Sequence, residues 1–222
     1  MERNREITVK GVGTYHVPVD FVTVTFTLDE LNKDYQKGHE DFESHIAALQ
    51  KTVEKLGFKK TELKTSAIQI SPKYDSVKRN SDYVEVFKGY RFYTNMNLAF
   101  NFDSKRLGSV FAAVGDIGFE PKLNVHFSVK DKEAVKNSLL ANAAKDAKIK
   151  ASVLCEAMGV KLGQLLTIQY NWDEIIINSS ARYEYDCKPM VASGAVSGSA
   201  IDFTPDDINL TDEACFVWAI EE

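Results

Sequence analysis

Histidine side chains are the first candidates for catalysis or metal binding in this chain. Four occur, at His16, His39, His45 and His126. A neutral imidazole acts as a general base or binds a metal ion when a second suitable group lies beside it. His39 and His45 flank the start of a predicted helix, and their separation of six residues places the two side chains on opposite sides. They cannot hold one ion together, so we interpret all four histidines as surface residues and predict no metal site.

Cysteine is the second residue type that could carry chemistry. The chain has three, Cys155, Cys187 and Cys215, and no Cys-x-x-Cys pair or other metal-binding spacing. Cys155 lies within a helical apolar pattern, which predicts a buried thiol. Cys187 falls in a polar loop and Cys215 begins the last predicted strand. A disulfide between these two is conceivable in an oxidising compartment, although the spacing favours free thiols.

A glycine pair near the N-terminus resembles the beginning of a phosphate-binding loop. Gly11-Val12-Gly13 follows a short strand, but the third glycine is missing and a second strand follows where a helix should start. No helix N-terminus would therefore face an anion. We interpret the glycines as a sharp turn with a close approach of two backbones. Because no nucleophile, metal or cofactor motif occurs elsewhere, the sequence predicts no catalytic residues, no cofactor and no enzyme.

Aromatic residues supply the candidate binding surface. Tyr93 falls on the polar face of the longest predicted strand, and a second group lies late in the chain. Tyrosine is enriched at protein interfaces, while the alternative is that these rings belong to the core. The candidate ligand or interface residues are Tyr93, Tyr170, Trp172, Tyr183 and Tyr185.

Regular alternation and helical stripes predict the elements that would position such a site. Strands are expected at 7–9, 22–28, 63–71, 83–102, 123–129, 166–172 and 214–220. Helices carry apolar stripes at 42–56, 107–114 and 135–158, the last with alanines in its middle that permit close approach to the sheet, and Gly57 is predicted to end the first helix. The order is β-β-α-β-β-α-β-α-β-β. Neighbouring hairpins and strands with one polar face predict an α+β fold, with a mainly antiparallel sheet and helices packed on one face.

Breaks between these elements predict the loops. Pro72 should stop regular pairing, and the polar stretch 73–82 is interpreted as a hairpin loop. Asp103 or Ser104, and later Asp131, are predicted helix caps. The Gly/Ser-rich stretch at about 178–204 is expected to be a flexible loop within a single domain that spans 1–222.

Composition excludes several classes of protein. The 222 residues are 44% hydrophobic, so general disorder is excluded, and the net charge of −5 comes from an acidic end, residues 202–222, that has no Lys or Arg. Without a basic excess we expect no nucleic-acid binding, and without about 20 uninterrupted apolar residues no transmembrane segment. The first residues contain no apolar signal core, which favours the cytoplasm, or the periplasm if a leader has been removed.

Several short motifs, in this order and spacing, resemble those of the SIMPL domain family. They include Val9-Lys10-Gly11-Val12-Gly13, Ser71-Pro72-Lys73-Tyr74, the run 144–151 and Gly159-Val160-Lys161-Leu162-Gly163. The resemblance covers about 6–177 and resumes at 205–220. Val19 and Lys148 depart from the usual pattern of the family. The resemblance implies an α+β domain, usually in the bacterial periplasm or envelope, with members linked to oxidative-stress tolerance, members that form ring-like oligomers and animal relatives that act as adaptors. It implies no catalytic residue.

These observations favour a non-enzymatic binding or assembly protein of the SIMPL type that associates with itself as a homo-oligomer. The main support is the combination of long amphipathic strands, aromatic polar faces and an unpaired sheet edge. One alternative is a small-molecule-binding protein or enzyme with its site under the 178–204 loop. Another is a cytosolic adaptor with a separate protein partner.

Overall fold

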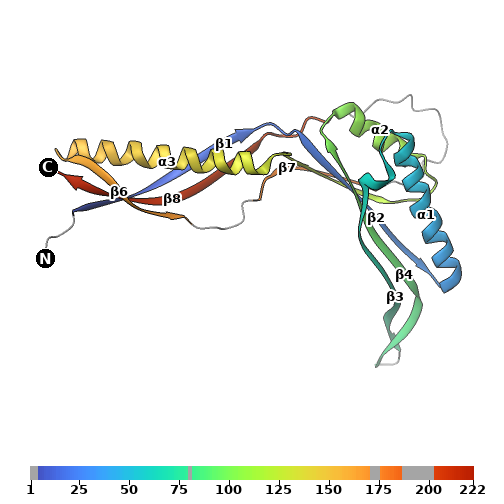
Figure 1. Ribbon diagram of the computed structural model, residues 1–222. Helices are drawn as coiled ribbons and strands as arrows, with labels where there is room; N and C mark the ends of the chain where they lie inside the picture. The colour runs from blue at the N-terminus through green and yellow to red at the C-terminus, as the bar shows by residue number, and fades with distance from the viewer. Residues whose placement is uncertain (1–4, 80–81, 171–175, 187–202) are drawn as a thin grey trace. The chain divides into compact units, whose positions relative to one another are not determined.

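The computed structural model describes residues 5–79, 82–170, 176–186 and 203–222 (Figure 1). In chain order these residues form β1 (Glu6–Val17), β2 (Phe21–Asn32), α1 (Tyr35–Lys55), the 3-10 helix η1 (Lys60–Glu62), β3 (Leu63–Arg79), β4 (Asp82–Asn101), α2 (Ser104–Gly115), β5 (Lys122–Ser128), α3 (Lys132–Ala157), β6 (Lys161–Tyr170), β7 (Asn178–Asp186) and β8 (Ile208–Glu221). The predicted α+β class is confirmed. No helix in the described part of the chain is long and apolar enough to cross a membrane.

The strands are distributed over two sheets in two compact units. Unit 1 takes its described residues from Met1–Val19, Ser128–Ser180 and Asp206–Glu222, and unit 2 from Asp20–Phe127 and Ala181–Pro205. One sheet has the order β1-β8-β6 and the other has the order β3-β4-β2-β5-β7. Alternation marks a strand but not its partner, so the sequence did not indicate a division into two sheets. The single domain over 1–222 stays a prediction.

In unit 1, helix α3 packs on the sheet through a stripe of mostly small side chains (Figure 1). Every fourth residue of α3 from Val135 to Cys155 is buried, including three alanines. Gly11 and Gly13 lie beneath them in the middle of β1, where a Cβ on Gly11 would overlap the carbonyl oxygen of Ala143. The predicted close approach is confirmed, but the predicted turn is wrong because both glycines pair with β8 in regular register.

Polar contacts fix the position of α3. Asp131 caps its start, as predicted, by accepting a hydrogen bond from the backbone N–H of Ala134 at 2.9 Å. Further along, the Asp146 carboxylate accepts one from Lys150 at 2.6 Å and one from the backbone N–H of Val12 at 2.7 Å. Both hydrogen bonds hold the pKa of Asp146 below its ordinary value, and the one from Lys150 has the larger effect. The carboxylate therefore joins α3 to β1.

In unit 2, α1 covers one face of the sheet at β2 and β4. These strands are antiparallel with Phe26 opposite Met96, and the inward side chains of both are buried. Asp34 caps α1 by accepting a hydrogen bond from the Lys37 backbone N–H at 3.0 Å. Gly57 follows the end of α1 with a φ of +84°, as its predicted role at a helix end requires.

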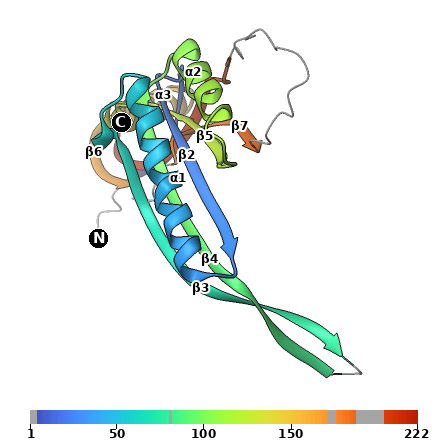
Figure 2. The same ribbon diagram turned by 90° about the vertical axis from the view of Figure 1, so that its right-hand side faces the viewer.

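The predicted loop at 73–82 is wrong, because β3 continues to Arg79 and β4 begins at Asp82. Pro72 does not end the pairing either: it lies opposite Tyr90 within the β3–β4 ladder. The proline is accommodated because β3 lies at the edge of the sheet, where a missing N–H costs no ladder hydrogen bond. The resulting hairpin extends beyond the N-terminal end of α1 (Figures 1 and 2).

The predicted loop at 178–204 is also partly wrong. Its first nine residues form β7, next to β5 at the other edge of the five-stranded sheet. Tyr183 explains why this stretch is ordered, since its ring makes edge-on contacts with Phe127 at 5.6 Å and Phe203 at 5.4 Å. The rest of the predicted loop, 187–202, lies outside the described residues.

Candidate functional site

Tyr93 belongs to a hydrogen-bonded network on the side of the sheet opposite α1. Its hydroxyl accepts a hydrogen bond from Asn95 Nδ2 at 2.8 Å, and the Arg91 guanidinium lies 5.1 Å from its ring centre. Arg91 Nε also donates to Asp29 Oδ1 at 2.6 Å. That hydrogen bond lowers the pKa of Asp29 and raises the pKa of Arg91. Tyr93 is half-buried, so it presents only part of its ring as a candidate interface residue.

The late aromatic residues have separate environments. Tyr170, in unit 1, packs against the core and donates a hydrogen bond from its hydroxyl to Asp212 Oδ2 at 2.9 Å. Tyr183, in unit 2, packs against the two phenylalanine rings described above. Trp172 lies outside the described residues, as does the side chain of Tyr185. The ligand or interface role predicted for these four residues stays a prediction.

The histidine and cysteine side chains of the described residues lie in separate environments. His45 Nδ1 lies 2.7 Å from Glu30 Oε1, and the His45 ring stacks on Phe119 at 4.3 Å. Cys155 is buried, as predicted. Cys187, the other candidate for a disulfide with Cys215, lies outside the described residues. Within the described ranges, no group of three or more His, Cys, Asp or Glu side chains is arranged to hold a metal ion.

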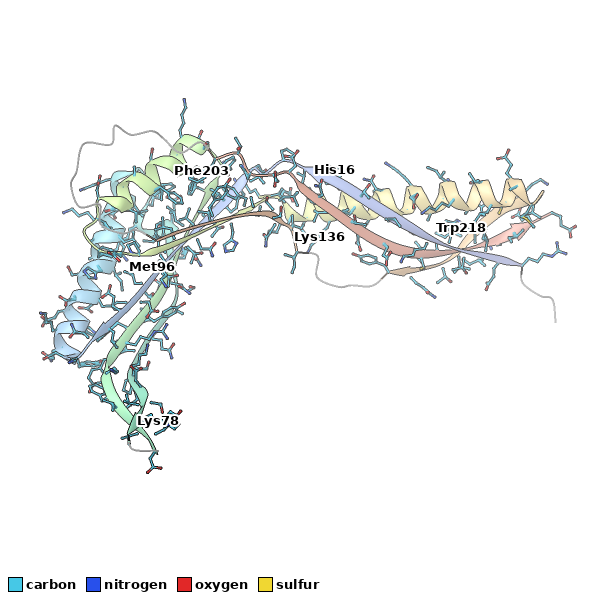
Figure 3. The ribbon with its side chains drawn as sticks, turned by 180° about the vertical axis from the view of Figure 1, so that it is seen from behind. His16, Lys78, Met96, Lys136, Phe203 and Trp218 are labelled. Carbon is cyan, nitrogen blue, oxygen red and sulfur yellow. The ribbon has the colours of Figure 1, made fainter. Side chains whose placement is uncertain are left out.

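The largest unexplained feature is the outer part of the β3–β4 hairpin, residues 72–90, which we call the arm. Lys78 lies near its tip, away from Met96 in the core (Figure 3). Large apolar side chains remain exposed along it, namely Tyr74, Val77, Tyr83, Val84 and Phe87. Tyr83, for example, is 71% exposed.

Both faces of the arm carry these side chains. Tyr74 lies opposite Phe87, and Val77 lies opposite Val84. The two pairs are three positions apart, and successive residues of a strand point to opposite faces. The arm therefore presents aromatic rings on one face and valines on the other, and neither face is covered by α1 over this length.

A chain of aromatic contacts joins the base of the arm to the core. Tyr74 contacts Phe87, Phe87 contacts Tyr90, and Tyr90 contacts Tyr35 on α1, with ring centres 5.2 to 5.6 Å apart. Tyr35 in turn contacts the buried Phe92 at 5.9 Å. Such edge-on and tilted ring pairs are favourable beyond the area that they bury. They anchor the arm to the same core that holds α1.

A shallow apolar groove follows the inner part of β3. It has a volume of about 330 Å³ and is lined by His39, Phe42, Glu43, Ile46, Ala47 and Gln50 of α1 and by Ile68 and Ile70 of β3. Ile68 is 63% exposed although it lies on the same face of the sheet as the core. The reason is that α1 covers β2 and β4, so the neighbouring edge strand is left partly bare.

Sequence reasoning missed both the arm and the groove. The polar residues of 73–82 concealed the arm, although Tyr83, Val84 and Phe87 are residue types that favour strands. The groove depends on where α1 lies across the sheet, which no local pattern specifies.

The comparison with protein families gave one finding. The family model named SIMPL, described as a protein of unknown function (DUF541), matches residues 7–218 and thus takes in both units. No match was found among curated proteins.

Proposed function

The chain belongs to the SIMPL family, whose function is unknown, and from this starting point we propose that it is a non-enzymatic assembly protein that associates with copies of itself. The observation that carries this proposal is the arm, a β-hairpin with large apolar side chains exposed on both faces. Contiguous exposed apolar surface usually marks an interaction site, because covering it removes unfavourable contact with water. The ordered contacts at the base of the arm make it suitable as a fixed docking element.

A second support is the exposed edge of β3. The main-chain groups of an edge strand can pair with another strand, and natural sheets usually protect such edges with charges, bulges or a covering segment. In β3, residues 65–72 include no charged side chain, and the run between the register shift at Thr65/Ala67 and Pro72 pairs regularly with β4. An uncharged edge next to an apolar groove is the kind of surface that binds an extended segment.

The alternative functions have less support than self-association. A ligand site under residues 178–204 stays a prediction, since 187–202 and Trp172 lie outside the described residues. The separate adaptor partner, the envelope setting and the link with stress tolerance also stay predictions, because they rest on charge, on the start of the chain or on the family resemblance.

The arm is tested by replacing Val77 and Val84 together with threonine. Threonine keeps the β-branched shape that suits a strand but replaces one methyl group per residue with a hydroxyl. Losing two buried methyl groups, at about 0.8 kcal/mol each, should weaken self-association about tenfold. Sedimentation velocity from low to high micromolar concentration measures this change.

Ser76→Thr is the matched control, because it changes the same hairpin without removing apolar surface, and it should associate like the unmodified protein. Circular dichroism confirms that each variant folds. If the double variant associates as strongly as the unmodified protein, the arm is not part of the contact and the proposal loses its main support.

A further inference from the structure

We propose that the groove beside β3 receives strand β6 of a second copy of the chain, which adds to the edge of the five-stranded sheet. This inference rests on the proposed self-association and names the segment of the second copy that lies against β3, next to the arm. It comes from an uncharged segment in each of two edge strands, residues 65–72 of β3 and 162–170 of β6, which carry pairs of apolar side chains at the same spacing.

The receiving edge is residues 65–72 of β3. Among the described strands, β3 pairs with β4 alone. Ile68 and Ile70 are two residues apart, so both side chains face the groove, where they line it together with Phe42 and Ile46 of α1. The strand therefore offers main-chain groups along its edge and an apolar surface beside them.

The inserted strand is β6, which lies at the edge of the three-stranded sheet. Residues 162–170 include no charged side chain. Helix α3 packs chiefly over β1 and β8, and the side chains of Leu166 and Ile168 in β6 are left 42% and 56% exposed. The ladder of β6 with β8 has register shifts before Thr167 and is regular from Thr167 to Tyr170. An uncharged, regular edge with exposed apolar side chains is prone to pairing unless another segment covers it.

The two edges complement each other in charge and in the spacing of their apolar side chains. Residues 65–72 of β3 and 162–170 of β6 carry no charged side chain, so no like charges on the two strands oppose each other. Leu166 and Ile168 have the same two-residue spacing as Ile68 and Ile70, so one register places all four side chains on the groove side. The partner is a second copy because each copy carries both surfaces, and the described residues of the same chain leave both exposed.

This contact joins two different surfaces, and it therefore has a direction. The groove of one copy takes the β6 of the next, whose own groove remains available. Such head-to-tail contacts build rings or open chains, whereas a symmetric contact between two identical surfaces stops at a dimer. The directional geometry can be tested separately from self-association as such.

The experiment uses two full-length variants. Ile68→Lys places a charge in the groove, and Ile168→Lys places one on the inserted strand. Both side chains are exposed in the folded chain, so folding should persist, as circular dichroism would verify. Each variant alone should lose about a hundredfold in self-association measured by sedimentation velocity, since a charged side chain would replace an apolar one inside the contact. Ile149→Lys, at an isoleucine of α3 that is 64% exposed and outside both edges, is the matched control and should associate normally.

Mixing the two variants gives the decisive result. Ile68→Lys keeps its β6 and Ile168→Lys keeps its groove, so an equimolar mixture should form a one-to-one heterodimer and nothing larger. Strand addition is overturned if the variants associate as well as the unmodified chain. It is also overturned if each variant is impaired and their mixture stays monomeric. In both cases the unmodified chain still associates, so the proposed self-association stands. If the unmodified chain is itself a monomer, both proposals fail.

Discussion

Replacing Gly11 with alanine is expected to destabilise unit 1 by about 3 kcal/mol, because an overpacked contact must move backbone. A Cβ at this position would overlap the Ala143 carbonyl oxygen and lie 2.7 Å from the Ala147 side chain. Neither neighbour is a flexible side chain, so α3 must shift away from β1. The shift would also disturb the hydrogen bond from Val12 to Asp146. The loss should appear as a lower midpoint of urea unfolding and faster hydrogen exchange along α3.

Gly115→Ala is the control for this substitution. Gly115 lies at the end of α2, where an added Cβ would meet no other atom within 4 Å, so the stability of this variant should be nearly unchanged. Equal stability of Gly11→Ala and Gly115→Ala would show that α3 does not rest on β1 as closely as described.

Replacing Phe92 with alanine is expected to cost unit 2 about 3–5 kcal/mol, the usual range for deleting a buried phenylalanine ring. Phe92 is fully buried and contacts Phe42 on α1 at 5.7 Å. Its ring also occupies the space left by Gly38, where a Cβ would overlap it. Losing the ring removes the main aromatic contact between α1 and the sheet. It also removes the inner end of the series of aromatic contacts that leads to the arm. Chemical unfolding followed by circular dichroism would measure the loss.

Phe87→Ala provides the comparison on the same strand. Phe87 is 42% exposed in the arm, so its replacement should change stability by well under half as much as Phe92→Ala and weaken self-association instead. If the two variants lost the same stability, the division between a core end and a surface end of the aromatic chain would be wrong.

Local patterns predicted the helices and most of the strands well. The cap at Asp131, the stripe of small residues on α3 and the stop at Gly57 each depend on residues close together in sequence, and each is confirmed. Pro72 and the stretch after it were misjudged because the cost of a proline depends on whether its strand lies at an edge. β3 is an edge strand because β4 is its one partner among the described strands of the five-stranded sheet, and the local sequence does not specify this.

The candidate site was less predictable than the fold. Tyr93 was correctly placed on the polar face of a strand, yet its network with Arg91 and Asp29 requires the β2–β4 register. The groove arises because α1 covers only part of a five-stranded sheet, and the exposure of Ile68 follows from that partial cover. An isoleucine in an alternating strand is otherwise indistinguishable from a core residue.

The proposals share one claim, that the apolar side chains left exposed in the isolated chain are covered by another copy. Sedimentation equilibrium of the unmodified protein over a series of dilutions tests this claim most directly. We expect a weight-average mass above the 24.9 kDa of a single chain, rising with concentration. A constant mass of one chain up to high micromolar concentration would contradict it.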